Sequence, residues 1–195
     1  SMAYKVLIHD YAGHPFQAEL SRELARRGNS VIHAFFGQDQ GPKGRMSPLP
    51  DDPATLSFEA LVTGLDYSKS NFIKRRSGDL AYGDVVAALV ERARPDVVIS
   101  GNMPTEAQEK LLAACRSANI PFIYWCQDFY SIAASHLLER RLPGIGHMVG
   151  AYYRFLERRQ MRRAAHIVHI TDAFCAQTDR WGIGRDKVSI IPNWG

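Results

Sequence analysis

The stretch Tyr4-Lys-Val-Leu-Ile-His9, followed by Asp10-Tyr-Ala-Gly-His-Pro15, decides the fold. Its first part is a short apolar run typical of a buried strand, and its second part is a polar break that contains Gly and Pro. A helical pattern over residues 16–27 comes next, and the β-branched and aromatic run at 30–36 predicts another strand. A strand, a helix and a strand of this length form a right-handed parallel crossover, the first unit of a doubly wound sheet.

The same alternation continues to the end of the chain. Further strands are predicted over residues 56–62, 97–100, 120–126, 166–170 and 187–191, and helices over residues 78–94, 108–118, 132–141, 146–165 and 172–181. Residues 37–53 are rich in Gly, Pro and Asp without periodicity, which predicts a long surface loop. Because the strand at 120–126 is apolar on both faces, we expect a mainly parallel sheet with helices on both faces. The predicted fold class is α/β, of the Rossmann-like doubly wound type.

The composition is that of one globular domain. The chain has 195 residues, of which 46% are hydrophobic and 23% charged, which excludes a disordered or collagen-like chain. Ser1-Met2 resembles the remnant of a cleaved tag. No apolar run approaches the roughly 18 to 20 residues of a membrane-spanning helix, and no signal sequence is visible, so a cytoplasmic location is expected. The odd number and wide spacing of the cysteines predict reduced, buried thiols at Cys115, Cys126 and Cys175.

Polar residues follow the predicted strands at four turns, which span 10–14, 101–104, 127–130 and 171–172. In an open parallel sheet, ligands bind outside the carboxyl ends of the strands, where loops and helix N-termini converge. The residues expected to line a crevice there are Asp10, Tyr11, Gly13, His14, Asn102, Gln127, Tyr130 and Thr171.

The known nucleotide and metal motifs do not fit these turns. The first turn has only Gly13 of the three glycines in GxGxxG, and no segment matches the GxxxxGK[ST] phosphate loop. His9, Asp10 and His14 lack the spacing of a metal site. We predict a hydrogen-bonded core histidine at His9, whereas ligand contact and helix capping are equally compatible with His14. No metal and no resident cofactor are expected.

Asp128 is the strongest candidate for a catalytic residue. It comes just after the apolar run Phe122-Ile-Tyr-Trp-Cys126, separated from it by Gln127. Burial at this place would raise the pKa of the carboxyl toward a range useful for catalysis. The alternative is that Asp128 caps the following helix. The residue pattern favours the catalytic role over the cap.

Positive charge is concentrated in residues 136–163, which hold seven arginines against Glu139 and Glu157, in a chain of net charge +4. An apolar stripe at helical spacing lies opposite Arg154, Arg158 and Arg162 and consists of Ile145, Met148, Val149, Tyr152 and Leu156. Such a helix either rests on an anionic lipid surface or packs on the core with solvated arginines outside. Nucleic-acid binding is not expected, because no recognition motif accompanies the charge.

Several degenerate motifs occur in an order that resembles the N-terminal domain of glycosyltransferase family 4, which has the GT-B fold. They are His14-Pro-Phe-Gln17, Leu20-Ser-Arg-Glu-Leu-Ala-Arg-Arg-Gly28, Trp125-Cys-Gln-Asp128, Phe155-Leu-Glu-Arg-Arg159, Ala165-His-Ile-Val168 and Lys187-Val-Ser-Ile-Ile-Pro-Asn-Trp194. The resemblance covers essentially the whole chain. It implies an acceptor-side domain over residues 1–191 and, at 192–195, the start of a linker to a donor-binding domain.

The resemblance further implies a retaining, metal-independent hexosyltransferase of bacterial polysaccharide assembly. Such an enzyme transfers a sugar from a nucleotide-sugar to a polysaccharide or lipid-linked acceptor, and this half alone is expected to be inactive. Asp128 is then expected to face the reacting sugar, while the loop at 11–14 offers backbone amides to the donor diphosphate. Peripheral contact with the inner face of the membrane is expected through Ile145–Arg163. The alternatives are a non-catalytic carbohydrate or lipid-carrier binding module and a nucleotide-binding module.

Overall fold

Seven parallel strands form one sheet in the computed structural model, which describes residues 3–37, 46–64 and 72–193. The strands are β1 (Lys5–Asp10), β2 (Ser30–Phe36), β3 (Leu56–Leu61), β4 (Val97–Gly101), β5 (Phe122–Cys126), β6 (His166–His169) and β7 (Val188–Ile190). Their order is β3-β2-β1-β4-β5-β6-β7, so the direction of chain progression reverses between β1 and β4. This is the Rossmann-like order, and the predicted parallel α/β class is confirmed.

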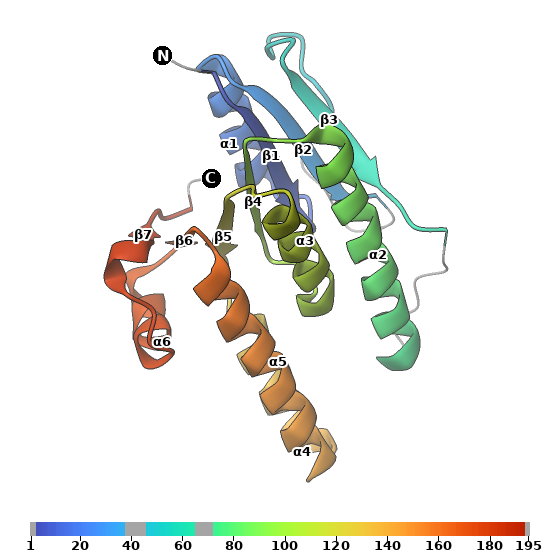
Figure 1. Ribbon diagram of the computed structural model, residues 1–195, viewed down its shortest axis with the longest axis vertical. Coiled ribbons are helices and arrows are strands. Elements are labelled where there is room, and N and C mark those ends of the chain that lie inside the picture. Colours follow the sequence, from blue (N-terminus) through green and yellow to red (C-terminus); the bar gives the residue numbers. More distant parts are fainter. Residues whose placement is uncertain (1–2, 38–45, 65–71, 194–195) are drawn as a thin grey trace.

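Helices cover both faces of the sheet, as predicted. They are α1 (Pro15–Arg26), α2 (Phe72–Ala93), α3 (Thr105–Ser117), α4 (Tyr130–Arg141), α5 (Ile145–Arg163) and α6 (Cys175–Arg180), with short 3₁₀ turns η1 (Asp172–Phe174) and η2 (Arg185–Lys187). Figure 1 shows α1 behind the sheet and α2, α3 and α5 in front of it. Connections that turn in opposite directions from the centre of a doubly wound sheet place their helices on opposite faces.

The core follows the alternation of side chains along the strands. On β1, Leu7 faces the larger cluster, which includes residues of α2 and α3. Its neighbours Val6 and Ile8 face a smaller cluster with Ala25 of α1. Removing an aliphatic side chain of this size from water contributes roughly 1.5 to 3 kcal/mol. All three cysteines are buried and unpaired with one another, as predicted.

Two helices begin earlier than the sequence pattern indicates. Helix α2 starts at Phe72 and α3 at Thr105, whereas apolar periodicity begins only near residues 78 and 108. The first turns of these helices pack against each other through a bidentate contact of Arg76 with Glu106, with N–O distances of 3.0 and 2.8 Å. A tertiary ion pair gives no apolar signal in the sequence. Residues 38–45, within the predicted loop, lie outside the described part of the chain.

Helices α4 and α5 form an antiparallel hairpin that extends beyond the sheet (Figure 1). Ser135 Oγ on α4 donates a hydrogen bond to the carbonyl of Gly150 on α5, at 3.1 Å. The apolar stripe of α5 does not pack on the core along its whole length. Leu156 is buried, but Ile145 is 67% and Met148 75% exposed. The alternative of a fully core-packed helix is therefore wrong for the outer half of α5.

Candidate functional site

The turns after β1 and β4 meet where the strand order reverses. Asn102 Nδ2 lies 3.4 Å from His14 Nε2, and this contact joins the two turns. Asn102 has a φ of 58°, a left-handed conformation that asparagine tolerates better than most residues. Gly101 is required just before it, because a Cβ there would lie 1.7 Å from the carbonyl oxygen of Trp125. Two of the residues expected to line a crevice, His14 and Asn102, are thus brought together.

The buried carboxyl group of Asp10 stabilises the first turn. Asp10 Oδ1 accepts a hydrogen bond from the backbone N–H of Gly13 at 3.0 Å, and Gly13 adopts a φ of 79°. Asp10 is fully buried, with Oδ2 3.5 Å from His33 Nε2. The expectation that the Asp10 side chain lines the crevice is therefore wrong, since the carboxyl holds the turn in place. Tyr11 is half-buried and stacks on the ring of Phe36, with centroids 4.9 Å apart.

His9 is a core histidine, as predicted. Its Nδ1 lies 3.1 Å from Ser100 Oγ and its Nε2 2.6 Å from Tyr82 Oη. Burial, with a smaller contribution from His33, lowers the pKa of His9 to about 3. The neutral imidazole is hydrogen-bonded at both ring nitrogens and thereby stabilises the packing of β1 against β4 and α2. Because His9 is fully buried, it has no access to a ligand.

The third turn carries Gln127, Asp128 and Tyr130. Asp128 is exposed, so the expectation that its carboxyl is buried at the end of β5 is wrong. Its Oδ1 accepts a hydrogen bond from the N–H of Phe129 at 2.8 Å, but Phe129 is the N-cap of α4 and no side chain caps this helix, so the alternative of a helix cap at Asp128 is wrong. Gln127 Oε1 accepts from Asn193 Nδ2 at 3.2 Å. The catalytic role of Asp128 stays a prediction.

The fourth turn has a structural role in the described chain. Thr171 Oγ1 accepts a hydrogen bond from the N–H of Ala173 at 3.3 Å and caps η1. Thr171 follows β6, so it shares the carboxyl edge of the sheet with the other three turns.

A buried carboxylate on α5 was not predicted as part of this region. Glu157 is 1% exposed, and its Oε1 and Oε2 accept hydrogen bonds from Ser131 Oγ and Ser131 N, each at 3.1 Å. Burial raises the pKa of Glu157 to about 7, and the negative charge of Asp128 acts in the same direction. Glu157 lies off the apolar stripe of α5, so helical periodicity carries no signal of its burial.

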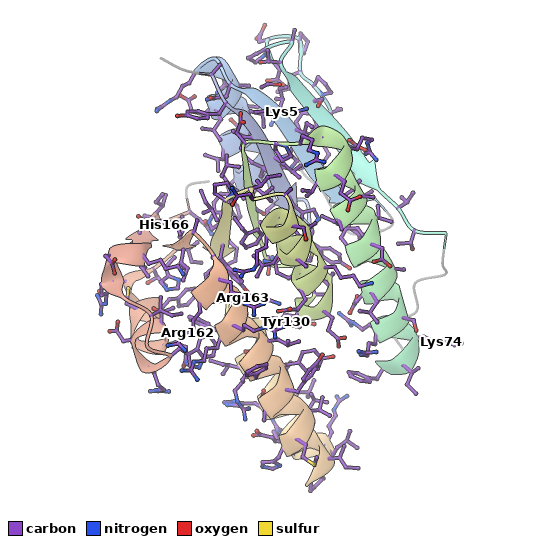
Figure 2. The ribbon with its side chains drawn as sticks, viewed as in Figure 1. Lys5, Lys74, Tyr130, Arg162, Arg163 and His166 are labelled. Atoms are coloured by element: carbon purple, nitrogen blue, oxygen red, sulfur yellow. The ribbon has the colours of Figure 1, made fainter. Side chains whose placement is uncertain are left out.

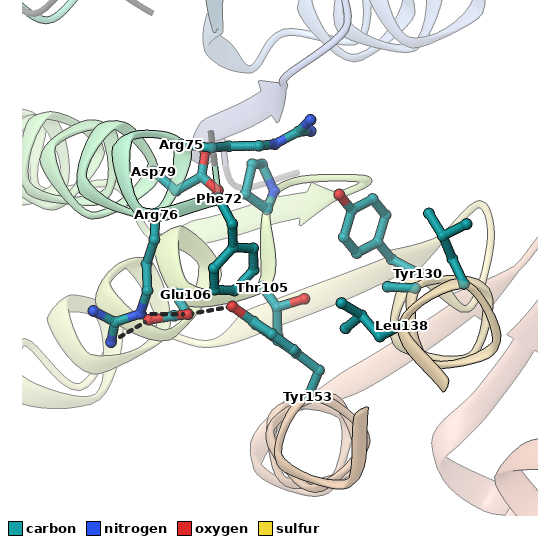
Figure 3. A pocket seen from close by; sticks show the side chains of 12 residues that line it. Phe72, Arg75, Arg76, Asp79, Thr105, Glu106, Tyr130, Leu138 and Tyr153 are labelled. Carbon is teal, nitrogen blue, oxygen red and sulfur yellow. Dashed lines mark hydrogen bonds and ion pairs between the residues drawn. The ribbon is translucent and has the colours of Figure 1, made fainter. Parts of the chain in front are cut away.

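A pocket of about 180 Å³ opens beside these turns, between α2, α3, α4 and α5. We refer to it as the four-helix pocket. Figure 3 shows the rings of Phe72 and Tyr130 and the side chain of Leu138 pointing into the same space. The complete lining consists of Phe72, Arg75, Arg76, Asp79, Pro104, Thr105, Glu106, Tyr130, Ala134, Leu137, Leu138 and Tyr153. Of these, only Tyr130 was singled out from the sequence, because the pocket depends on how the helices pack.

The strand order and the meeting of two turns at its reversal define a Rossmann-like α/β domain with a ligand crevice at the carboxyl edge of the sheet. The chain belongs to the glycosyl transferase 4-like domain family, whose profile matches residues 13–194. No protein of curated function matches the sequence significantly.

Several solved structures share this fold. A sucrose-phosphate synthase structure from Thermosynechococcus elongatus superposes with a TM-score of 0.64 at 10% identity, over 97% of this chain and 89% of that one. HepE of Anabaena, in complex with UDP and glucose, gives 0.56 at 17% identity, over 98% of this chain and 45% of HepE. A UGT transferase from Siraitia grosvenorii in complex with UDP gives 0.59 at 13% identity, over 95% and 50%. This chain therefore spans about half the length of HepE and of the Siraitia transferase.

Proposed function

We propose that this chain is the acceptor-side domain of a retaining hexosyltransferase, which transfers a sugar from a nucleotide-sugar to a polysaccharide or lipid-linked acceptor. The observation that carries the proposal is the family match over residues 13–194. Since HepE and the Siraitia enzyme were solved with UDP, a UDP-sugar is the donor we propose. The domain covers residues 1–191, and a linker to a donor-binding domain begins at 192–195. The domain alone is inactive, and transfer needs no metal.

The crevice supplies positioning and electrostatics in this proposal. The backbone amides of residues 11–14 face the donor diphosphate, and the contact between His14 and Asn102 keeps the two turns at a fixed separation. The exposed carboxylate of Asp128 orients a donor hydroxyl or accepts a proton from the acceptor. Holding the reactants in place and stabilising a leaving diphosphate account for most of the rate in such a transfer.

Peripheral contact with an anionic membrane is the second part of the proposal. Ile145 and Met148 on α5 and Leu142 beside them are more than half exposed, and Arg140 and Arg141 are exposed next to them. Apolar side chains flanked by arginines favour the interface of anionic lipids. Within the described ranges, no helix is long and apolar enough to cross a bilayer. We place the contact at the cytoplasmic face of the membrane, where a lipid-linked acceptor would be presented.

Not all arginines of α5 take part in this contact. Arg154 pairs with Glu139 at 3.3 Å and Arg159 with Glu109 at 2.6 Å. Figure 2 shows Arg162 and Arg163 near the sheet, at the opposite end of α5 from the tip of the hairpin. The membrane contact of Ile145–Arg163 is therefore concentrated in its first turns.

Transfer by the complete gene product tests the proposal. We expect radiolabelled sugar to move from UDP-glucose or UDP-N-acetylglucosamine into a lipid or polysaccharide fraction, and Asp128→Ala to lower kcat by about 100-fold or more. The matched control is Asp186→Ala, an exposed aspartate before β7 at the opposite edge of the sheet. Normal turnover of Asp128→Ala would refute the catalytic assignment. Saccharide or lipid-carrier binding without transfer would support a non-catalytic module, and nucleotide binding by residues 1–191 alone would support a nucleotide-binding module.

A further inference from the structure

We infer that Glu157 and Gln160 on α5 are positioning residues that fix the spacing between the two crevice turns at 101–104 and 127–130. The inference rests on the proposed function and names the side chains that align Asn102 with Asp128 for transfer. Each of the two residues is only 1% exposed, so they act through other residues and not by contact with a substrate.

Both residues lie on the same buried side of α5. They stand three positions apart, which places two side chains next to each other along a helix. Helix α5 packs against both α3 and α4 (Figure 1), and Glu157 bonds to α4 while Gln160 bonds to α3. Burying a carboxylate and an amide costs free energy unless each finds hydrogen-bonding partners. The partners are in the first turns of the two helices.

Glu157 bonds to the start of α4. The first N–H groups of a helix have no acceptor within the helix, and the side chain of the N-cap residue Phe129 supplies none. Instead, the carboxyl group of Glu157 accepts hydrogen bonds from the N–H and the hydroxyl of Ser131, the second residue of α4, each at 3.1 Å. Glu157 therefore fixes the position at which α4 begins, and the turn that contains Asp128 ends there.

Gln160 bonds to the start of α3. Its Nε2 donates to the carbonyl oxygen of Thr105, the first residue of α3, at 2.8 Å, and to Oε1 of Glu109, one turn further along, at 3.1 Å. Both amide hydrogens thus have acceptors on one helix. Because Thr105 comes directly after the turn at 101–104, Gln160 holds the end of that turn as Glu157 holds the end of the turn at 127–130.

The sheet fixes the other ends of the same two turns. Strands β4 and β5 pair in parallel with Ser100 opposite Tyr124, and the backbone of Gly101 lies against the carbonyl of Trp125. Each turn is thus held by a strand where it begins and by α5 where it ends. The separation of the turns therefore depends on the two bonds from α5. A misplacement of about 1 Å can lower the rate of an enzyme about 100-fold.

Other contacts within the hairpin lie away from the turns. Ser135 on α4 bonds to the carbonyl of Gly150 on α5, and Glu139 pairs with Arg154 at 3.3 Å. Both contacts join the two helices farther along α4. Glu139 is therefore a matched control, because it links the same helices as Glu157 without touching the first turn of α4.

Steady-state kinetics of sugar transfer by the complete gene product, at saturating acceptor, test the inference. Methionine keeps the length of both side chains but removes their hydrogen bonds, so Glu157→Met and Gln160→Met should each lower kcat by about tenfold or more. The KM for the UDP-sugar should change less than about twofold, because the amides at 11–14 keep their place. Glu157→Gln keeps one carbonyl acceptor and should restore kcat to within about threefold of wild type. The control Glu139→Met should leave kcat unchanged within about twofold.

Amide hydrogen exchange of the same variants measures the turns without any substrate. Relative to wild type, exchange should rise about tenfold or more at 127–132 in Glu157→Met and at 101–106 in Gln160→Met, and in neither segment in Glu139→Met. Unfolding midpoints above the assay temperature show that each variant is folded. If Glu157→Met does not fold, Gln160→Met carries the same test.

Wild-type kcat in both methionine variants would overturn the inference, as would an equally large loss of kcat in Glu139→Met. Exchange that rises evenly over the chain would also overturn it, because that result indicates general destabilisation. If the wild-type gene product transfers sugar and exchange in the two segments is unchanged in the variants, the inference alone is refuted. If exchange rises as expected and the wild type transfers no sugar, the proposed function alone is refuted.

Discussion

Glu157 on α5 holds the first turn of α4 through two hydrogen bonds from Ser131, one from its backbone N–H and one from its hydroxyl. Ser131 comes three residues after Asp128 in the chain, so a buried acid lies behind the turn that carries the predicted catalytic residue. Burial raises the pKa of Glu157 to about 7. The charge behind this turn therefore changes near neutral pH.

This carboxyl should make stability depend on pH in a defined window. Between the ordinary pKa of 4.5 and the folded value of about 7, the folded chain keeps a proton that the unfolded chain has lost. Stability from Glu157 is thus fully present below pH 4.5, falls by about 1.4 kcal/mol per pH unit through this window, and is constant above it. Replacing Glu157 with Gln removes the slope, so the stability of Glu157→Gln relative to wild type should rise by roughly 3 kcal/mol from pH 5 to pH 8.

Urea denaturation at pH 5, 6, 7 and 8 measures this difference. Taking the difference between variant and wild type cancels the opposite slopes of His9 and His169, whose lowered pKa values make stability rise with pH below 6.5. The control is the exposed Glu91→Gln, which should show no such trend. A difference for Glu157→Gln that is the same at all four values of pH would contradict the prediction.

Gly101→Ala should destabilise the domain by roughly 3 kcal/mol, because the new Cβ meets a backbone atom and not a movable side chain. That atom is the carbonyl oxygen of Trp125, 1.7 Å from the ideal Cβ position, so β4 and β5 must separate at their ends. Gly64→Ala is the matched control, since no atom of residues 3–37, 46–64 and 72–193 lies within 4 Å of its ideal Cβ position. Chemical denaturation compares the two variants, and unfolding midpoints that agree would show that the strands adjust without cost.

Much of the fold follows from residues that are adjacent in the sequence. The apolar runs ending at His9, Cys126 and His169 predict strands, and the alternation with helices predicts parallel pairing. The switch-point pair of His14 and Asn102 also follows, because residues that end neighbouring parallel strands meet at one edge. Hydrophobic periodicity does not predict whether an individual polar residue is buried.

Asp10 and Asp128 illustrate this limit. Asp10 is the last residue of β1, and Asp128 comes two residues after the end of β5. Nevertheless, Asp10 is fully buried and Asp128 is exposed. After Asp10 the chain turns back over the carboxyl group, and Gly13 bonds to it. After Asp128 the chain starts helix α4, and the carboxyl group stays at the surface. The four-helix pocket is likewise a product of tertiary packing, since its walls are separated by up to 81 residues between Phe72 and Tyr153.

Tyr82→Phe should destabilise the domain by about 1 to 3 kcal/mol, because it leaves one nitrogen of His9 buried without a partner. The hydroxyl that is lost lies 2.6 Å from His9 Nε2, and the rest of the ring keeps its packing. Tyr4→Phe is the control, since Tyr4 is 50% exposed. Thermal unfolding at pH 7 provides the comparison, and equal midpoints for Tyr82→Phe and wild type would show that the hydrogen bond contributes nothing net.

Met148→Glu combined with Ile145→Glu should abolish flotation of the protein with anionic liposomes. Both side chains project from the outer half of α5, and a carboxylate at either place opposes insertion among acyl chains and anionic headgroups. Ala176→Glu, exposed on α6, introduces a negative charge elsewhere and should leave flotation intact. Wild-type protein that floats equally with neutral and anionic vesicles would argue against the arginines as binding groups.

The hairpin of α4 and α5 extends beyond the sheet (Figure 1). Helix α4 has 12 residues, which corresponds to a length of about 18 Å, and its inner end is Tyr130. Because Glu157 bonds to Ser131 at that inner end, the hairpin and the turn with Asp128 are held in one fixed arrangement. Anchoring the tip on any flat surface would consequently fix the angle at which the crevice meets that surface, and with it the direction from which an acceptor approaches.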